Sequence, residues 1–401
     1  MRILMPSIVD PVSQLGGAWT ATRGLVDLLR ASPFDAEVVL VPPDVLSPTA
    51  HRARQYLALA QSFVSGVPAK FQFKFSRRVL ATMKDLLSKA DFDLILINGS
   101  DLLWMLPHLP PAAARILVAH NVEHLLYADQ IAVEGPHWLP LKSILRSDCA
   151  RLRKQELAGL RAIGNVVFLS SEDERYVRVA CPHLRAISVP PLMKASPAAR
   201  PPYSVGSSVM EIGMLANFGW WPSQQGVRWF LREVFPYLNH ARLHLFGNHS
   251  QEVASEHSNV VKHGYLLELG VIWSACDFMI CPVFAGGGVS IKLVEAISHG
   301  VPVVATHYAI RGIPVEPDPA IVLRDSTGEW IEFLNSPAAR ELHRLSPSPR
   351  IIARFLPECY IEGLSNFLKA VLSEARSSKV EPIVEVRQSE KIAFDTQGSD
   401  S

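Results

Sequence analysis

Residues 286–313 read GGGVSIKLVEAISHGVPVVATHYAIRGI, and this stretch decides the fold. A short apolar run at 278–283 precedes it, and a second apolar run at 301–307 lies inside it. Apolar runs without polar alternation are typical of strands that are buried on both faces of a parallel sheet. Between the runs lie three glycines and a short helical pattern, and Gly300 suits the residue that follows a helix C-terminus. The order of strand, glycine turn, helix and strand predicts an α/β fold.

The glycine triplet Gly286–Gly288 has two interpretations, one purely structural and one functional. It can be a flexible turn before a helix on which Lys292 and Glu295, three residues apart, form a solvated ion pair. It can also be a phosphate cradle, because glycines let the backbone approach a ligand closely and the N-terminus of the next helix favours an anion. Lys292 would then add a full positive charge, and Glu295 would accept hydrogen bonds from sugar hydroxyls. This second interpretation suits a nucleotide.

Apolar runs of this kind recur along the chain in two series. The first series is 2–7, 36–43, 92–99, 114–120 and 165–171, and the second is 209–215, 241–247, 259–265, 278–283, 301–307 and 320–325. We therefore expect two doubly wound α/β domains, at 1–190 and 209–356, that face each other across a cleft. The segment 191–208, rich in Pro, Ser and Ala, is the predicted linker. A helix is expected at 357–376, and the polar segment 377–401 is expected to be disordered.

Composition narrows the class of protein. With 401 residues, of which 48% are hydrophobic and 19% charged, the chain is predicted to be a well-filled globular protein. A net charge of +1 does not indicate a nucleic-acid partner. The five cysteines include no CxxC pair, so we expect reduced thiols and no structural zinc site. The start, MRILMPSIV, suits a first strand better than a signal peptide, and no window is apolar enough to span a membrane. A cytoplasmic location is expected.

The stretch at 286–313 resembles the nucleotide-sugar-binding signature of glycosyltransferase family 4, the group 1 glycosyltransferases, which commonly reads G-x-x-x-K-x-x-E-A-x-x-x-G-x-P-V-V-A-T. Upstream, GMLANFGWWPSQQGVRWFLREVFP (213–236) and HLFGN (244–248) are similar to the opening strand, loop, helix and second strand of that family's C-terminal domain. HGYLLELGVIWSACDFMICPV (263–283) is similar to the run that follows. The resemblance covers about residues 209–325. It implies a GT-B fold, in which two Rossmann-like domains face each other across a cleft.

The resemblance assigns roles to the glycine triplet and its helix. It implies that Lys292 binds the donor diphosphate and that Glu295 binds the donor ribose. The backbone amides that would contact phosphate or the transferred sugar are those of Gly287, Gly288 and Val289. Many members of the family carry a glutamate where this chain has Gly287, and an arginine in the segment that here reads ANFGWWPSQ (216–224). These two departures leave the contacts to the donor sugar open.

Further candidates lie in the first domain, on the expected opposite wall of the cleft. Gly16 and Gly17 follow the first strand, where the family has a Gly-Gly pair that faces the donor phosphates, and a simple two-glycine turn is the alternative. His120 ends a predicted strand in the run HNVE, and the resemblance implies contact with the donor sugar or the acceptor. A purely structural histidine is the alternative. Glu123 and Glu172 are weaker candidates, and Glu172 also suits the first turn of a helix.

The resemblance also implies an activity. A sugar would pass from a nucleotide sugar to a saccharide or lipid-linked saccharide, with retention and without a protein nucleophile or a metal, in glycan or polysaccharide biosynthesis. His120 and Lys292 are the predicted catalytic residues. A nucleotide-sugar epimerase on the same fold, which would need paired carboxylates in the cleft, is one alternative. A GT-B subunit that only binds a partner is the other.

Two basic stretches of the first domain are candidates for contact with an anionic membrane. KFQFKFSRR (70–78) mixes basic and aromatic residues with alternating spacing, and 141–161 predicts a basic amphipathic helix. An ordinary edge strand and a solvated helix face are the respective alternatives. If the contact holds, the protein would be peripheral to the inner face of a membrane, and its acceptor would be a lipid-linked sugar.

Overall fold

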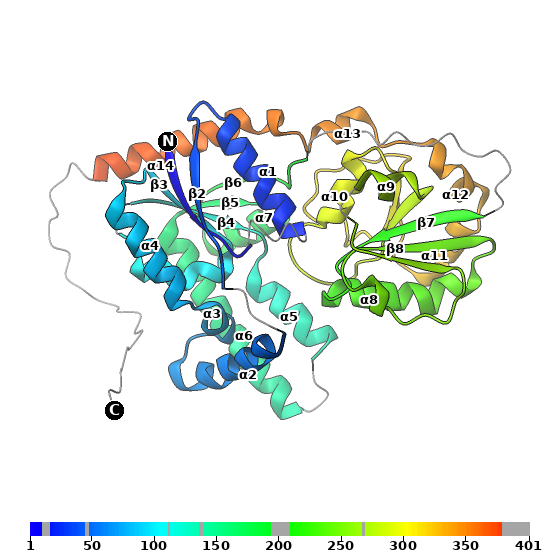
Figure 1. Ribbon diagram of the computed structural model, residues 1–401, viewed down its shortest axis with the longest axis horizontal. Coiled ribbons are helices and arrows are strands. Elements are labelled where there is room, and N and C mark those ends of the chain that lie inside the picture. Colours follow the sequence, from blue (N-terminus) through cyan, green and yellow to red (C-terminus); the bar gives the residue numbers. More distant parts are fainter. Residues whose placement is uncertain are drawn as a thin grey trace.

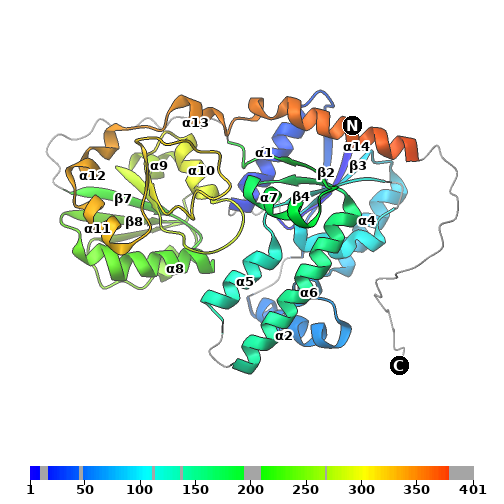
Figure 2. The same ribbon diagram turned by 180° about the vertical axis from the view of Figure 1, so that it is seen from behind.

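The computed structural model describes residues 1–9, 17–44, 48–110, 113–135, 139–193, 209–266 and 269–378. In these residues the chain forms two parallel sheets of six strands each, side by side along the long axis of the molecule (Figure 1). The strand orders are β2-β1-β3-β4-β5-β6 and β12-β11-β10-β7-β8-β9. Helices cover both faces of each sheet, as the view from behind also shows (Figure 2). The predicted pair of doubly wound α/β units is confirmed.

The strands lie where the apolar runs predict them. The first sheet contains β1 (Arg2–Pro6), β2 (Glu37–Val41), β3 (Leu94–Asn98), β4 (Ala114–Ala119), β5 (Asn165–Phe168) and β6 (Arg185–Ser188). The second contains β7 (Met210–Leu215), β8 (Ala241–Phe246), β9 (Val260–Gly264), β10 (Phe278–Cys281), β11 (Val303–Ala305) and β12 (Ile321–Leu323). All eleven predicted strands are present. The twelfth, β6, has the sequence RAIS, which contains no extended apolar run and therefore gives no strand signal.

The helices connect these strands and cover the sheets. The first unit contains α1 (Gly17–Ala31), α2 (Pro48–Ser65), α3 (Ala69–Lys74), α4 (Arg77–Lys89), α5 (Glu123–Val133), α6 (Leu139–Ile163) and α7 (Ser171–Ala180). The second contains α8 (Trp221–Trp229), α9 (Leu269–Ser274), α10 (Ile291–Ser298), α11 (Thr327–Leu334), α12 (Pro337–Glu341) and α13 (Pro349–Ala353). Short 3₁₀ or π turns are η1 (Ser100–His108), η2 (Phe230–Val234), η3 (Phe235–Tyr237), η4 (Ser250–Glu252), η5 (Leu342–Arg344) and η6 (Pro357–Cys359).

Helix α14 (Ile361–Ser378) follows the second sheet in sequence but packs on the first (Figure 1). Its buried Leu364 and Leu368 join the core formed by Ile3 of β1 and Leu28 of α1. The apolar area that these side chains remove from water stabilises the return of the chain. The chain therefore crosses between the two units twice, once before β7 and once before α14.

One prediction about the first unit is wrong. The stretch 70–78 forms most of α3 and the start of α4, and not the edge strand that was the alternative to a membrane-binding segment. The amines of Lys70 and Lys74 lie 3.3 Å and 3.8 Å from carboxylate oxygens of Asp101. Because both lysines are partnered within the protein, they are poor candidates for binding lipid. The predicted helix at 141–161 lies within α6.

Some predictions fall outside the described residues. These are Gly16, most of the linker 191–208, and the tail beyond 378. Among the helices of the described ranges, none combines the length and the apolar character needed to cross a membrane.

Candidate active site

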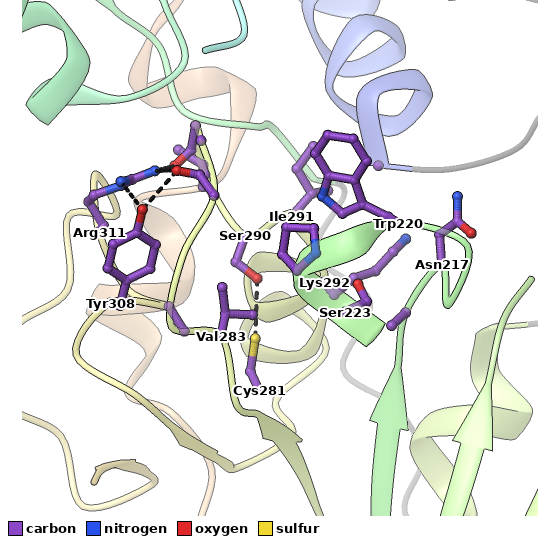
Figure 3. Close-up of a pocket in the computed structure, with 18 of the residues that line it drawn as sticks. Asn217, Trp220, Ser223, Cys281, Val283, Ser290, Ile291, Lys292, Tyr308 and Arg311 are labelled. Carbon is purple, nitrogen blue, oxygen red and sulfur yellow. Dashed lines mark hydrogen bonds between the residues drawn. The ribbon is translucent and has the colours of Figure 1, made fainter. Parts of the chain in front are cut away.

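A cavity of about 420 Å³ lies between the two units. The strand order of the second sheet reverses between β7 and β10, and ligands of doubly wound folds bind beyond the carboxyl ends of the strands at such a point. The cavity is lined there by the ends of β7 and β10, by the start of α10, and by the loop 282–290, here called the glycine loop (Figure 3). Gly17, His120 and Asn121 line it from the first unit.

Helix α10 starts at the edge of this cavity. Its N-cap residue, Ser290, makes no capping bond to the helix, and the Ser290 hydroxyl lies 3.3 Å from Sγ of Cys281 instead. The first amides of α10 therefore have no side-chain acceptor at the N-cap, which leaves the partial positive charge of the helix end available to a ligand. Lys292 is the second residue of the helix. Gly300 ends it with φ of 72°, in the left-handed conformation expected after a C-terminus.

Lys292 and Glu295 form the ion pair that their spacing predicts, and they form it at the cleft. The amine of Lys292 lies 3.0 Å from Oε2 of Glu295, which is only 3% exposed. The other oxygen, Oε1, accepts a hydrogen bond of 3.0 Å from Thr20 of α1, in the first unit. Both carboxylate oxygens of Glu295 are therefore held, one by each wall of the cleft. The structural interpretation, in which Lys292 and Glu295 form a solvated surface ion pair, is therefore excluded.

A second cavity, of about 240 Å³, lies directly beside the first. Lys292 lines both cavities, as does the segment 215–217 after β7. Glu295 and Thr20 line the smaller cavity, together with Trp19 and Tyr265. An elongated ligand could thus place one end beside Glu295, pass Lys292, and reach the glycine loop with its other end.

Close contact with the first unit explains two of the three glycines. Gly288 has φ of 65°, and a Cβ placed on it would lie 2.3 Å from the carbonyl oxygen of His120. A Cβ on Gly287 would lie 3.1 Å from Oδ1 of Asn121. Gly17 lies in a similar position on α1, because its Cβ would meet the Ile291 side chain at 3.1 Å. The glycines therefore let the two walls of the cavity approach each other.

His120 is buried and neutral. Its Nε2 lies 2.8 Å from Oδ1 of Asn98. The amide nitrogen of Asn98 donates to the hydroxyls of Ser7 and Thr22, both at 2.9 Å, so Oδ1 is the acceptor and Nε2 of His120 carries the proton. Burial lowers the pKa of His120 to about 4. At neutral pH the ring therefore has an unprotonated Nδ1, which can accept a proton from a hydroxyl but cannot act as a cationic acid.

Glu123 does not line the cavity, and its candidacy as a cleft residue is wrong. It is 2% exposed and pairs with Lys70, while its Oε1 accepts a 3.2 Å hydrogen bond from the Asn121 amide. Burial, reinforced by the charge of Asp101, raises the pKa of Glu123 to about 7. Burial alone would lower the pKa of Lys70, but the carboxylates of Asp101 and Glu123 outweigh it, so the pKa of Lys70 is raised. This cluster fixes the orientation of Asn121, which in turn faces the glycine loop.

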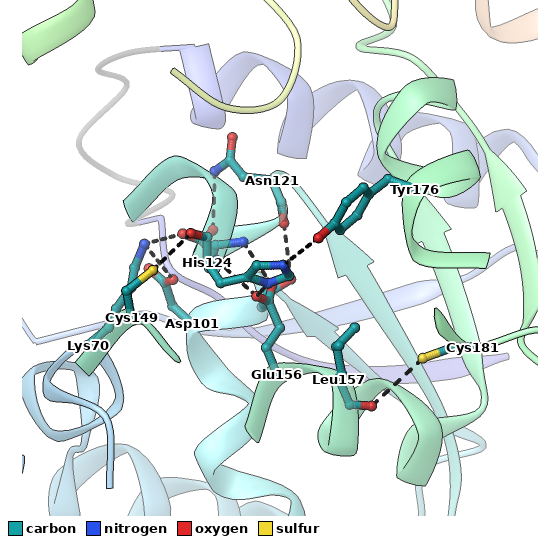
Figure 4. A network of polar contacts seen from close by, with 11 residues as sticks. Lys70, Asp101, Asn121, His124, Cys149, Glu156, Leu157, Tyr176 and Cys181 are labelled. Atoms are coloured by element: carbon teal, nitrogen blue, oxygen red, sulfur yellow. Dashed lines mark hydrogen bonds and ion pairs between the residues drawn. The ribbon is translucent and has the colours of Figure 1, made fainter. Parts of the chain in front are cut away.

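Glu156 holds the start of α5 in place (Figure 4). Its buried carboxylate accepts hydrogen bonds from the backbone amides of Glu123 and His124, at 2.8 Å and 3.0 Å, and lies 2.7 Å from Nδ1 of His124. The N-cap residue of α5, Val122, has no side chain that could satisfy these amides. A carboxylate from α6 therefore takes the role of a capping residue, which fixes the turn that follows His120.

Glu172 lies at the first turn of α7, as its bland interpretation predicts. Its carboxylate also lies 3.8 Å from the Arg311 guanidinium of the second unit. Within the described residues, no group of three or more His, Cys, Asp or Glu side chains could hold a metal ion. The expected independence from metal remains a prediction.

A known protein family matches part of this chain, and known structures share the fold described above. Residues 210–332 match the family model described as glycosyl transferases group 1. Among similar solved structures, sucrose-phosphate synthase from Thermosynechococcus elongatus is 16% identical, with 93% of this chain and 100% of that chain covered and a TM-score of 0.66. Anabaena HepE, solved with UDP and glucose, is 14% identical, with 92% and 100% covered and a TM-score of 0.59. The lipopolysaccharide outer core galactosyltransferase WaaB is 12% identical, with 92% and 99% covered and a TM-score of 0.54. At these identities the structures show a shared fold.

The two facing units have the GT-B fold, and together with the match of residues 210–332 to the group 1 model they indicate a glycosyltransferase. Within that class, residues 210–332 match the model of the group 1 glycosyltransferases, as the resemblance seen in the sequence implies for this part of the chain. The family match favours neither the alternative of an epimerase nor that of a subunit that only binds a partner. No protein of curated function shows a significant sequence match.

Proposed function

We propose that this glycosyltransferase transfers a sugar from a nucleoside diphosphate sugar to a saccharide or lipid-linked saccharide acceptor, in glycan or polysaccharide biosynthesis. The position of Lys292 in the wall of both cavities carries the proposal. The nucleoside would occupy the smaller cavity with its ribose at Glu295, and the diphosphate would pass Lys292. The transferred sugar would lie in the larger cavity, near His120. HepE, solved with UDP and glucose, supports a donor of this kind.

The chemistry of the cavity suits transfer with retention. Departure of the nucleoside diphosphate develops negative charge, which Lys292, the N-terminus of α10 and the amides of the glycine loop would stabilise. The described polar side chains that line the larger cavity are neutral or basic. This set supports attack by the acceptor hydroxyl from the face that the leaving group vacates. His120 would accept a hydrogen bond from a sugar hydroxyl through its unprotonated Nδ1, and we propose that no metal takes part.

Thermal denaturation with a panel of nucleoside diphosphates and nucleotide sugars tests this function. A ligand that binds only the folded protein raises the melting temperature, by an amount that follows its concentration relative to Kd. We expect the diphosphates of one base to raise the melting temperature more than those of the others, and the matching nucleotide sugar to be consumed when an acceptor is supplied. A panel without any shift at millimolar ligand would contradict the proposal.

We further propose that the first domain contacts an anionic membrane through α2. This helix exposes the apolar side chains of Tyr56, Leu57, Phe63 and Val64, with Val64 92% exposed, and turns the small Ala58 and Ser62 inward. Exposed apolar side chains on one helix, with basic residues nearby, suit the surface of a lipid bilayer. On α6, which packs against α2, Arg146, Arg153 and Lys154 are exposed and make no ion pair with described residues.

Sedimentation with vesicles tests this contact. We expect the wild type to sediment with vesicles that contain anionic lipid, and a Leu57→Gln/Val64→Gln variant to lose most of that binding because the apolar contact is removed. Val179→Gln on α7 is the matched control, since Val179 is 86% exposed but lies on another helix. Equal sedimentation of all three proteins would contradict the assignment to α2, and a concentration-dependent dimer that the double variant abolishes would assign the helix to self-association.

A further inference from the structure

Arg311 lines the larger cavity and contacts the carbonyl side of the glycine loop (Figure 3). Its Nη2 donates to the carbonyl oxygens of Gly286 and Gly288, at 3.1 Å and 3.4 Å. Its Nη1 donates to the hydroxyl of Tyr308 at 2.6 Å, and its guanidinium lies 4.4 Å from the centre of the Tyr308 ring. One side chain thus holds two carbonyl groups of the loop and one aromatic neighbour.

Tyr308 extends this contact to the first domain. Its hydroxyl lies 2.9 Å from Oδ2 of Asp129 on α5 and 2.7 Å from the Gly286 carbonyl oxygen. Burial raises the pKa of Tyr308 to about 12, so the phenol keeps its proton. One proton serves one acceptor at a time, and Arg311 already donates to Gly286, so Asp129 is the better partner. The same Oδ2 of Asp129 accepts a 3.2 Å hydrogen bond from the amide of Gly286.

These contacts determine where the amides of the loop point. In a planar trans peptide the carbonyl and the following N–H point in opposite directions. When Arg311 holds the carbonyls of Gly286 and Gly288, the amides of Gly287 and Val289 are directed away from Arg311. Among the described residues, neither amide has an acceptor within the protein. Both residues line the larger cavity, so these amides are available to a ligand there.

We infer that Arg311 is a positioning residue, which together with Tyr308 and with Asp129 of the opposite domain orients the glycine-loop amides toward the distal phosphate of the donor. The inference rests on the proposed function, because it assumes that the site binds a nucleoside diphosphate. Asp129 is 157 residues away from Gly286 in sequence and belongs to the other wall of the cleft. The order of the loop therefore depends on the approach of the two domains.

Binding of nucleoside diphosphates and monophosphates separates this role from general stability. A monophosphate can place its ribose at Glu295 without reaching the loop, whereas a diphosphate reaches the loop amides. Wild type and variants are titrated calorimetrically with the diphosphates and monophosphates of uridine, adenosine and guanosine. For Arg311→Gln we expect about 10- to 100-fold weaker diphosphate binding, the range for lost hydrogen bonds to charged groups, with monophosphate binding unchanged. Tyr308→Phe and Asp129→Ala each remove fewer contacts and should weaken diphosphate binding about two- to tenfold.

Tyr360→Phe is the matched control, because the Tyr360 hydroxyl also donates to a backbone carbonyl, that of Arg354 at 3.0 Å, but outside the site. It should leave both affinities unchanged. If the wild type prefers the diphosphate and the Arg311→Gln, Tyr308→Phe and Asp129→Ala variants all keep that preference, the inference is overturned and the proposed function stands. If the wild type binds no nucleotide of the panel, the proposed function fails and the inference fails with it. A parallel loss of monophosphate binding would show a merely structural role and would also overturn it.

Discussion

Replacing Lys292 by alanine is expected to lower kcat by about 100- to 1,000-fold, the range seen when one group that stabilises developing charge is removed. Lys292 is the cation at the second position of α10 and lies in the wall of both cavities. Its charge acts most strongly on the diphosphate as the bond to the sugar breaks, so kcat should fall more than the affinity for the donor. Initial rates with the donor that the thermal panel identifies measure this effect.

Two comparisons make the Lys292 experiment specific. Lys369→Ala removes an exposed lysine of α14, remote from the cleft, and should leave the rate unchanged. The melting temperature of Lys292→Ala reports whether Glu295, which keeps its hydrogen bond from Thr20, is still accommodated in the fold. A folded Lys292→Ala enzyme with wild-type turnover would remove Lys292 from the catalytic site.

The sequence predicts the local parts of this molecule well, because their causes are local. Eleven strands follow from short, mainly apolar runs, and the proximity of Lys292 and Glu295 follows from helical spacing alone. The chain reversal at Gly300 follows from the conformational freedom of glycine. The strand β6 is absent from the prediction because its sequence, RAIS, begins and ends with a polar residue and contains no extended apolar run.

The second wall of the site depends on tertiary contacts that spacing does not reveal. Thr20 contacts Glu295 across 275 positions, and Asp129 contacts Tyr308 across 179. Glu123 is a carboxylate close in sequence to His120, which suggests a cleft residue. In the structure it is buried, pairs with Lys70 and accepts a hydrogen bond from Asn121, so it supports Asn121 instead. For the contacts that Arg311 makes with the glycine loop, the sequence offers one signal, the pair Arg311 and Gly312 after the strand that follows α10. That signal indicates a turn but does not reveal its partners.

Replacing Gly288 by alanine is expected to lower activity about 100-fold, the scale of effect that a misplacement of about 1 Å produces in an active site. The new Cβ would lie 2.3 Å from the carbonyl oxygen of His120 and 2.5 Å from Oδ1 of Asn121. A backbone carbonyl cannot rotate away as a side chain can, so either the glycine loop or the first domain must shift. Either shift moves the amides of the loop away from the donor.

Gly164→Ala separates this clash from backbone strain. Gly164 has φ of 73°, close to the 65° of Gly288, but a Cβ there would meet nothing within 4 Å. Both substitutions therefore carry the left-handed strain of roughly 1–2 kcal/mol, and only Gly288→Ala also forces the walls of the cavity apart. From chemical denaturation we expect both variants to lose free energy of unfolding through this strain, with a larger loss for Gly288→Ala because of the clash, and a loss of transfer activity for Gly288→Ala alone. Equal activity in both variants would mean that the close approach of His120 to the glycine loop is not needed for transfer, and the two domains would then act on the donor without the contact seen here.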